Sequence, residues 1–145
     1  MNTTTARLIA ATAGDLIALT STFDSRYGKN YRMTPGSPDD AWQLQQGIFD
    51  QQTALARLLD PFALENPLQR MTPWWKFQDV MDTGMATQVA AEAFHLIACC
   101  ASAEATARTE PSPVIICSQR TIAGFLHPST LLVAQEEPVA VRKVS

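Results

Sequence analysis

Apolar residues recur at helical spacing through the first two thirds of the chain. The first such pattern covers about residues 5–23 and places an apolar stripe on one side of a helix. The stripe comprises Leu8, Thr12, Leu16, Leu19 and Phe23. A threonine at position 3, 4 or 5 can act as the N-cap, because its side-chain oxygen can accept a hydrogen bond from a free backbone N–H. The pattern therefore predicts a first helix.

The second predicted helix has the clearest start signal in the sequence. Ser37 is expected to be the N-cap and Pro38 the first helical residue, while Asp39 and Asp40 lie at the positive end of the helix dipole. Apolar residues then recur at Leu44, Ile48, Leu55, Leu58 and Phe62. We expect this helix to end near Asp60, because a proline follows.

A third helical pattern is the longest and the richest in alanine. It runs from Trp74 to about Arg108, after a segment, residues 61–71, whose two prolines predict a turn or a short 3₁₀ helix. A single helix of that length would exceed the usual range of about 8–20 residues, so a break or kink is expected at Thr83-Gly84. The alanines would let another helix approach closely.

The character of the sequence changes after the prolines at positions 111 and 113. Short runs of β-branched and apolar residues, separated by turn residues, predict three or four strands. The runs are Val114–Cys117, Thr121–Leu126, Leu131–Ala134 and Val139–Val144. We therefore expect a mainly α, α+β fold, with a bundle of three to four helices over about residues 5–108 and a small C-terminal antiparallel β-element over about residues 113–144. The length of 145 residues suits a single domain covering residues 1–145.

Charge narrows the classes of function. Charged residues make up 17% of the chain, below the usual fraction of about 25%, so some faces are expected to be covered by a partner or by another copy. The net charge is −3; residues 1–72 carry 6 basic and 7 acidic side chains, and residues 73–145 carry 5 and 7. Because neither half is basic, the sequence argues against a nucleic-acid partner.

The cysteines and the apolar segments bear on the compartment. Cys99, Cys100 and Cys117 are odd in number, and two of them are adjacent in a helical pattern, so they do not indicate a disulfide framework. They predict small buried residues in a reducing compartment. The N-terminal segment lacks the shape of a signal sequence, and the chain has no uncharged apolar stretch of about 18 residues. The expected location is cytoplasmic, without a membrane.

One group of side chains suggests catalysis. Glu92, His95 and Cys99 are spaced three and four residues apart, which places them on one face of a helix. A histidine can activate a thiol as a nucleophile, and a glutamate can orient the histidine. Catalytic cysteine and histidine usually meet across a fold, so the sequence favours a packed cysteine and a hydrogen-bonded histidine. A small cysteine-dependent enzyme stays open as an alternative.

Metal and cofactor sites are not expected. The Glu92–His95 pair has the spacing of one half of a di-iron site, but the chain holds only one such pair. The other histidine is His127, in a predicted turn, and no CxxC or HxxxH spacing indicates zinc. The chain also lacks GxSxG, Rossmann, HExxH, kinase and Walker motifs.

The loop of residues 24–37 holds both tyrosines of the chain and several basic residues. Its candidate binding residues are Arg26, Tyr27, Lys29, Tyr31 and Arg32. Basic and aromatic side chains on one loop can bind phosphate or stack on bases, and they are also enriched in protein–protein hot spots. They can equally form a solvated loop whose tyrosines lean on the body of the domain. The charge balance favours a protein partner over a nucleic acid.

Trp74 and Trp75 are a second candidate contact. Adjacent residues on a helix point about 100° apart, so the two side chains cannot enter the core in the same direction. Trp75 is therefore a candidate interface anchor, unless residues 61–71 cover it. The edges of the predicted sheet offer further surface for a partner strand.

These observations favour a small non-enzymatic protein-binding module that acts as an inhibitor or adaptor of a larger complex. A small, motif-poor single domain is typical of phage or mobile-element proteins that counter host defence, which is an association and not a derivation. A homo-oligomeric accessory protein, with the alanine-rich helix as its interface, is one alternative. The others are a cysteine-dependent enzyme and a nucleic-acid binder that uses the 26–32 loop.

Overall fold

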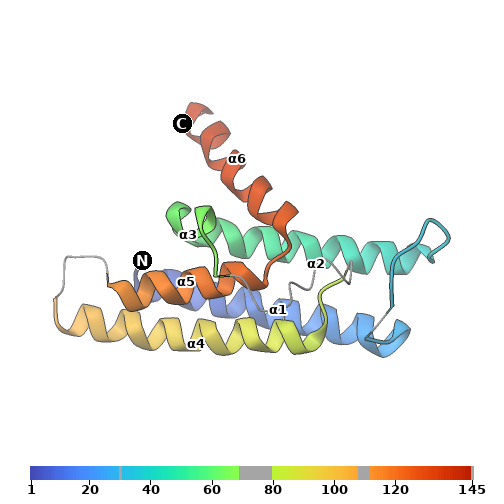
Figure 1. Cartoon of the computed structure of the whole chain (residues 1–145), viewed down its shortest axis with the longest axis horizontal. Helices are drawn as coiled ribbons and strands as arrows, with labels where there is room; N and C mark the ends of the chain where they lie inside the picture. Colours follow the sequence, from blue (N-terminus) through green and yellow to red (C-terminus); the bar gives the residue numbers. More distant parts are fainter. Residues whose placement is uncertain (30, 69–79, 108–111, 145) are drawn as a thin grey trace.

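The computed structural model describes residues 1–29, 31–68, 80–107 and 112–144, with side chains placed up to residue 136. Within these residues every regular element is a helix (Figure 1). The helices are α1 (Thr3–Tyr27), α2 (Asp39–Leu58), α3 (Pro61–Glu65), α4 (Thr83–Ala105), α5 (Pro113–Phe125) and α6 (Pro128–Val144). α1 packs along α4 and α2, α5 packs on α4 and α3, and α6 leaves the bundle at an angle while contacting α2.

The predicted C-terminal β-element is wrong, because residues 113–144 form the two helices α5 and α6. A short apolar run does not by itself distinguish a strand from a buried segment of helix. On α5 the buried positions recur at helical spacing and include Ile115, Ser118, Gln119, Ile122 and Ala123. Both helices also begin with a proline, at a position where the missing N–H has no intrahelical partner to lose. The described chain is therefore all-helical and not α+β.

The antiparallel pair of α1 and α4 is fastened at both ends. The Thr3 backbone N–H donates to Glu104 Oε1 at 2.8 Å, and the Thr3 hydroxyl donates to Oε2 at 2.5 Å. At the opposite end, the Asp24 carboxylate accepts from the backbone N–H of Thr83 at 3.0 Å and from its hydroxyl at 2.7 Å. Asn2 supplies the N-cap of α1, so the threonines predicted for that role are not the cap.

α2 begins one residue later than the sequence predicts. Pro38 is the N-cap and Asp39 the first helical residue, and Ser37 makes no capping bond. The Ser37 hydroxyl instead accepts from the backbone N–H of Thr34 at 2.9 Å and from the Tyr31 hydroxyl at 3.0 Å. Ser37 therefore closes the loop that leads into α2.

α4 begins where the sequence predicts a break. Its first residue is Thr83, and Asp82 caps it by accepting from the Met85 backbone N–H at 2.8 Å. The earlier part of the third helical pattern, residues 74–79, lies outside the described residues.

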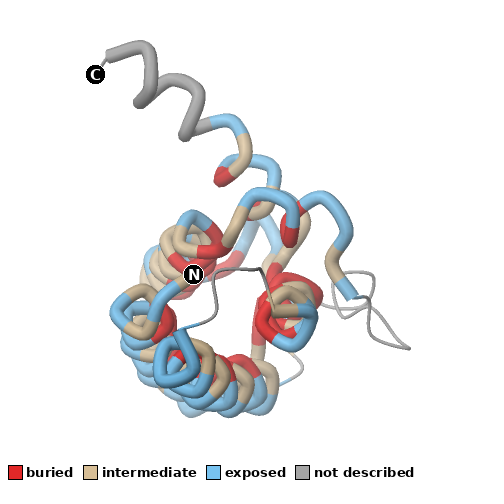
Figure 2. Tube along the Cα trace, turned by 90° about the vertical axis from the view of Figure 1, so that its left-hand side faces the viewer, coloured by how far each residue is buried: buried red, intermediate tan, exposed pale blue. Residues whose placement is uncertain are grey.

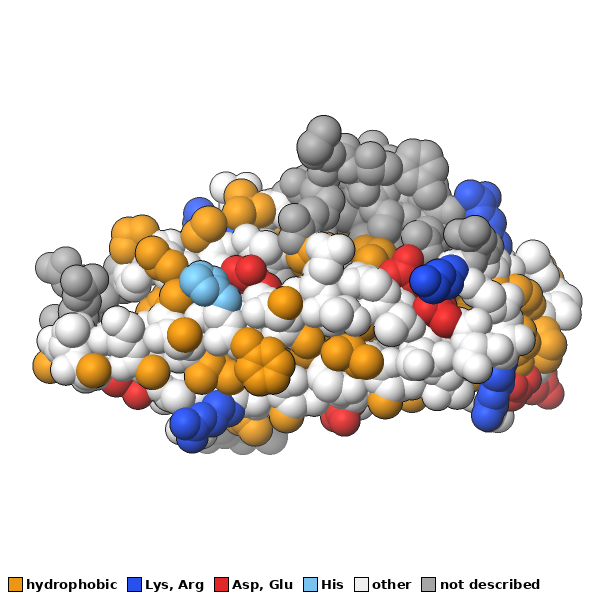
Figure 3. Space-filling view, turned by 90° about the horizontal axis from the view of Figure 1, so that it is seen from below, with side chains coloured by type: hydrophobic (Ala, Val, Ile, Leu, Met, Phe, Trp, Pro, Cys, Tyr) orange, Lys and Arg blue, Asp and Glu red, His pale blue; other side chains and the backbone are white. Residues whose placement is uncertain are grey.

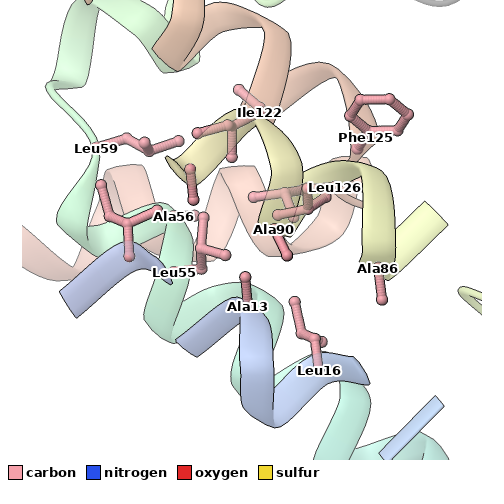
Figure 4. Packing of buried hydrophobic residues seen from close by; sticks show 14 of the residues in the cluster. Ala13, Leu16, Leu55, Ala56, Leu59, Ala86, Ala90, Ile122, Phe125 and Leu126 are labelled. Atoms are coloured by element: carbon pink, nitrogen blue, oxygen red, sulfur yellow. The ribbon is translucent and has the colours of Figure 1, made fainter. Parts of the chain in front are cut away.

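The core lies where α1, α2, α4 and α5 meet, with buried residues on the inward side of each helix (Figure 2). Figure 4 shows core side chains from these helices and from the C-caps of α2 and α5: Ala13, Leu16, Leu55, Ala56, Leu59, Ala86, Ala90, Ile122, Phe125 and Leu126. Alanines on α1 and α4 allow the two helices to pack closely. Leu8, predicted in the α1 stripe, is 52% exposed, whereas the next residue, Ile9, is fully buried.

Gly124 lets the chain cross α5. The backbone N–H of Leu68 donates to the Arg120 carbonyl at 3.1 Å, which lays the segment after α3 directly on α5. A Cβ added at Gly124 would lie only 1.7 Å from the Leu68 carbonyl oxygen. Only a residue without a side chain fits beneath this crossing.

α4 is long and apolar enough to cross a membrane, judged by length and composition alone. One third, 33%, of its most apolar window is buried inside the molecule. A core helix passes the same test, so this single helix is weak evidence for a membrane.

Candidate functional site: the α2 groove

The turn between α5 and α6 is held against α2. The backbone N–H of His127 donates to Gln52 Oε1 at 2.7 Å, and Gln52 is 1% exposed. The His127 ring packs edge-on against Phe49, with ring centroids 5.0 Å apart and an interplanar angle of 79°. His127 Nδ1 then accepts from the backbone N–H of Ser129 at 3.2 Å, which caps the start of α6. This turn therefore fixes where α6 leaves α2.

Two hollows lie on the outer side of α2 beside this turn. One has a volume of about 420 Å³ and the other about 310 Å³. The larger is lined by Gln46, Phe49, Asp50, Thr53, Arg57, Ser129, Thr130 and Val133. The smaller is lined by Met33, Trp42, Gln45, Gln46, Phe49 and His127. Because Gln46 and Phe49 line both, the hollows adjoin, and we call them together the α2 groove.

The α2 groove combines exposed apolar side chains with a polar rim. Trp42 is 45% exposed and Val133 is 43% exposed, although both are large apolar residues. On the rim, Gln46 Nε2 donates to Asp50 Oδ1 at 2.8 Å. An aromatic side chain half open to water beside ordered polar groups is typical of a protein-binding surface.

The segment that the sequence predicts as a loop, residues 24–37, begins inside α1, which continues to Tyr27. The loop that follows adjoins one end of the α2 groove through Met33. The two tyrosines of the segment face inward: Tyr27 and Tyr31 pack on Phe23, with ring centroids 5.1 and 5.8 Å from that ring. The Tyr31 hydroxyl donates to Ser37, as described above. The geometry is that of a loop whose tyrosines lean on the body of the domain.

An ion pair also links the two helix ends that flank this loop. Arg26 Nη1 lies 3.1 Å from Asp40 Oδ2, and both side chains are about half exposed, at 55% and 48%. A hydrogen bond to Asp40, with burial as the second cause, raises the pKa of Tyr27 to about 12. The same hydrogen bond, assisted by Arg26, holds the pKa of Asp40 below its usual value. In the part of the chain that is described, exposed Lys29 and Arg32 make no ion pair. Trp75, the sixth predicted binding residue, lies outside the described residues.

The three residues that the sequence offers as a weak catalytic candidate, Glu92, His95 and Cys99, have a geometry that does not favour a thiolate. Cys99 Sγ lies 3.5 Å from His95 Nε2 on the exposed side of α4. Burial, followed by the nearby Glu92 carboxylate, raises the pKa of the Cys99 thiol. A hollow of about 310 Å³ lies beside it between α4 and α5, lined by Ala98, Cys99, Ser102, Ala103, Thr106, Ser112 and Val114. A thiol with a raised pKa is a poor nucleophile at neutral pH.

A second contact resembles a nucleophile beside a base. The Ser129 hydroxyl lies 2.8 Å from His127 Nδ1. The same nitrogen accepts the Ser129 backbone N–H, and the His127 carbonyl accepts the backbone N–H and the hydroxyl of Thr130. These bonds all belong to the first turn of α6, so the arrangement is a histidine N-cap and carries no separate chemistry. No cluster of three or more His, Cys, Asp or Glu side chains that could hold a metal occurs among the residues that the structure places.

Sequence reasoning missed the α2 groove because its two walls are far apart in the chain. The available signal is His127-Pro128, a cap followed by a proline, which the strand prediction instead assigns to a turn. In comparisons with known proteins, no family model, curated protein or solved structure matches the chain.

Proposed function

We propose that the protein is a non-enzymatic protein-binding module that receives a helix of its partner in the α2 groove. The observation that carries the proposal is the pair of adjoining hollows along one helix, with exposed Trp42 and Val133 on their walls. Aromatic residues in such positions supply much of the binding energy in protein–protein interfaces.

The spacing of the two hollows suits a helix. The α2 residues that line the smaller hollow run from Trp42 to Phe49, and those that line the larger run from Gln46 to Arg57. The midpoints of these spans are six residues apart, which corresponds to about 9 Å along α2. Residues i and i+7 of a partner helix lie about 10 Å apart on the same face, so they can enter the two hollows together when the helix lies slightly oblique to α2.

The length of the α2 groove agrees with this occupant. From Trp42 to Arg57 it extends about 22 Å along α2, which is about four turns of a docked helix. Lys29 and Arg32, next to the Met33 end, would favour acidic residues at one end of the partner helix. The role as inhibitor or adaptor, and the kind of complex bound, remain predictions from the sequence.

Site-specific photocrosslinking tests the proposal. A benzoylphenylalanine residue is placed at Gln46, which lines both hollows, and separately at Leu8, which is exposed and lines neither. We expect one protein of the native host to be crosslinked from position 46 and not from position 8. The crosslinked peptide of that protein should have helical periodicity with apolar residues at i and i+7.

Affinity measurement with the purified partner completes the test. Trp42→Ala should weaken binding by about 30-fold, the size of a hot-spot loss of about 2 kcal/mol, while Leu8→Ala should leave it unchanged. Absence of a crosslink at position 46, or equal affinity of the Trp42→Ala and native proteins, would rule out the α2 groove as the docking site.

A further inference from the structure

α4 carries two apolar stripes, of which the core uses only one. The buried stripe comprises Ala86, Val89, Ala90, Ala93, Leu96 and Cys100. The exposed one, which we call the outer stripe, comprises Thr87, Ala91, Phe94, Ala98, Ala101 and Ala105. Its steps of four, three, four, three and four residues are those of a seam along which another helix packs. Phe94 is 65% exposed, the highest value among the exposed large hydrophobic residues that are described.

The surroundings of the outer stripe are poor in charge. The only charged residues of α4 are Glu92 and Glu104, and neither belongs to the stripe. Figure 3 views the molecule from below, where α4 is the lowest helix of Figure 1; hydrophobic and uncharged side chains dominate this face, with few charged ones. Water therefore covers an unusually apolar helix face in the single molecule.

We propose that a second copy of the chain covers the outer stripe, with the two α4 helices antiparallel about a two-fold axis level with residue 96. In this register the numbers of facing residues add up to 192. Every position of the stripe then faces another position of the stripe: Thr87 faces Ala105, Ala91 faces Ala101, and Phe94 faces Ala98 of the second copy.

The antiparallel register accommodates the one large side chain of the outer stripe, that of Phe94. Phe94 is its only large side chain, and it faces the small side chain of Ala98, so a knob meets a hole twice across the axis. A parallel pair in register would instead place the two Phe94 rings at the same level, with empty space above and below them. A contact that each copy makes with the same surface of the other also closes into a dimer.

α1 leaves room for this approach. The hydrogen bonds between α1 and α4 join residue 3 to residue 104 and residue 24 to residue 83. In each pair the two residue numbers add up to 107, so residues of α1 and α4 whose numbers have this sum lie side by side. Ala11, Gly14 and Ala18, all exposed, therefore lie level with residues 96, 93 and 89 of α4, in the first half of the outer stripe. A Cβ built on Gly14 meets nothing within 4 Å, which shows open space beside the helix.

The available area is near what a dimer requires. α4 has 23 residues and is about 34 Å long, and together with α1 it presents a strip about 18 Å wide. This corresponds to about 600 Å² on each copy, or about 1,200 Å² in total, the lower end of stable interfaces. The dimer is therefore expected to dissociate on dilution. It uses a surface distinct from the α2 groove, so it does not depend on the proposed function.

Light scattering coupled to gel filtration tests the dimer over a range of concentrations. At high concentration the native protein should have the mass of two chains, and this mass should fall toward that of one chain on dilution. Phe94→Glu should have the mass of one chain throughout, with an unchanged circular dichroism spectrum. Leu132→Glu is the matched control, because Leu132 is 60% exposed on α6 and outside the stripe, and it should remain a dimer. A native monomer at the highest concentration overturns the proposal, and a monomer that floats with phosphatidylcholine and phosphatidylglycerol vesicles overturns it in favour of a membrane.

Disulfide trapping tests the register. Ala91→Cys and Ala101→Cys are prepared with Cys99 and Cys117 replaced by serine, which leaves only the buried Cys100. The mixed proteins should form a disulfide between position 91 of one copy and position 101 of the other, and neither variant alone should crosslink. Crosslinking of each variant to itself, without the mixed product, would show a parallel pair and overturn the register.

Discussion

Gly124→Ala tests whether the chain after α3 must lie directly on α5. The new Cβ would lie 1.7 Å from the Leu68 carbonyl oxygen and 2.9 Å from its carbon, against ordinary contacts of 3.4 Å or more. The neighbour is backbone, which cannot rotate away as the end of a side chain can. The segment must retreat, and the bond from the Leu68 N–H to the Arg120 carbonyl is lost with it.

The expected effect is destabilisation by about 2 kcal/mol. Overpacking of this kind costs about 1–3 kcal/mol, and the lost hydrogen bond adds about 0.5–1.5 kcal/mol. The higher helix propensity of alanine offsets about 1 kcal/mol of this loss, because glycine is unfavourable inside a helix. With a urea dependence of about 2 kcal/mol per molar, the unfolding midpoint should fall by about 1 M.

Gly47→Ala is the matched control for this prediction. Gly47 also lies inside a helix, but a Cβ there would make an ordinary contact at 3.6 Å with a Leu19 methyl group. The same substitution should therefore stabilise the protein by about 1 kcal/mol. Both midpoints come from urea unfolding followed by circular dichroism. If Gly124→Ala were as stable as Gly47→Ala, the close crossing over α5 would be refuted.

Three further predictions follow from contacts elsewhere. Gln119→Met should lower the free energy of unfolding by about 2–3 kcal/mol in urea, because fully buried Gln119 accepts the Asp60 N–H at 2.8 Å and donates to its carboxylate at 2.9 Å; an unchanged midpoint would exclude this link. In an ultraviolet titration Tyr27 should ionise near pH 12, and Asp40→Asn should bring that value toward 10. Because folding raises this pKa, its stabilising contribution is complete below pH 10 and is lost between pH 10 and 12; ionisation of Tyr27 near pH 10 in the native protein would contradict it. Cys99 should react with iodoacetamide at pH 7 more slowly than glutathione, because its pKa is raised, and mass spectrometry of the labelled peptide measures this; faster reaction would reopen the catalytic interpretation.

The helical first part of the chain could be predicted because its signals are local. The stripe ending at Phe23, the proline before α2 with the aspartates of its first turn, and the break at Thr83 each act within a few residues. The errors in the predicted helix ends are also only about one residue: Asn2 is the N-cap of α1 in place of a threonine, and α2 begins one residue later than predicted. Such shifts arise because several neighbouring residues compete for the same free N–H groups.

The C-terminal part could not be predicted in this way. The run Val114–Ile116 has a strong β preference, but burial of Ile115 against the rest of the core outweighs it. Tertiary packing supplies far more free energy than the tenths of a kcal/mol that separate residue propensities. The strand prediction failed because it weighed composition over the two prolines that begin α5 and α6.

The candidate surfaces also depend partly on local sequence and partly on tertiary packing. The sequence alone determined which residues could lie on one helix face, including the spacing of the alanines and Phe94 on α4. It also determined the low fraction of charged residues, from which we predict that some faces are covered by a partner or another copy. Only the tertiary structure decided which face of α4 stayed open, that Tyr27 and Tyr31 turn inward, and that Gln46 and His127 meet at one groove. Spacing within a helix follows from 3.6 residues per turn, whereas the meeting of residues 46 and 127 at one groove depends on how every intervening element packs.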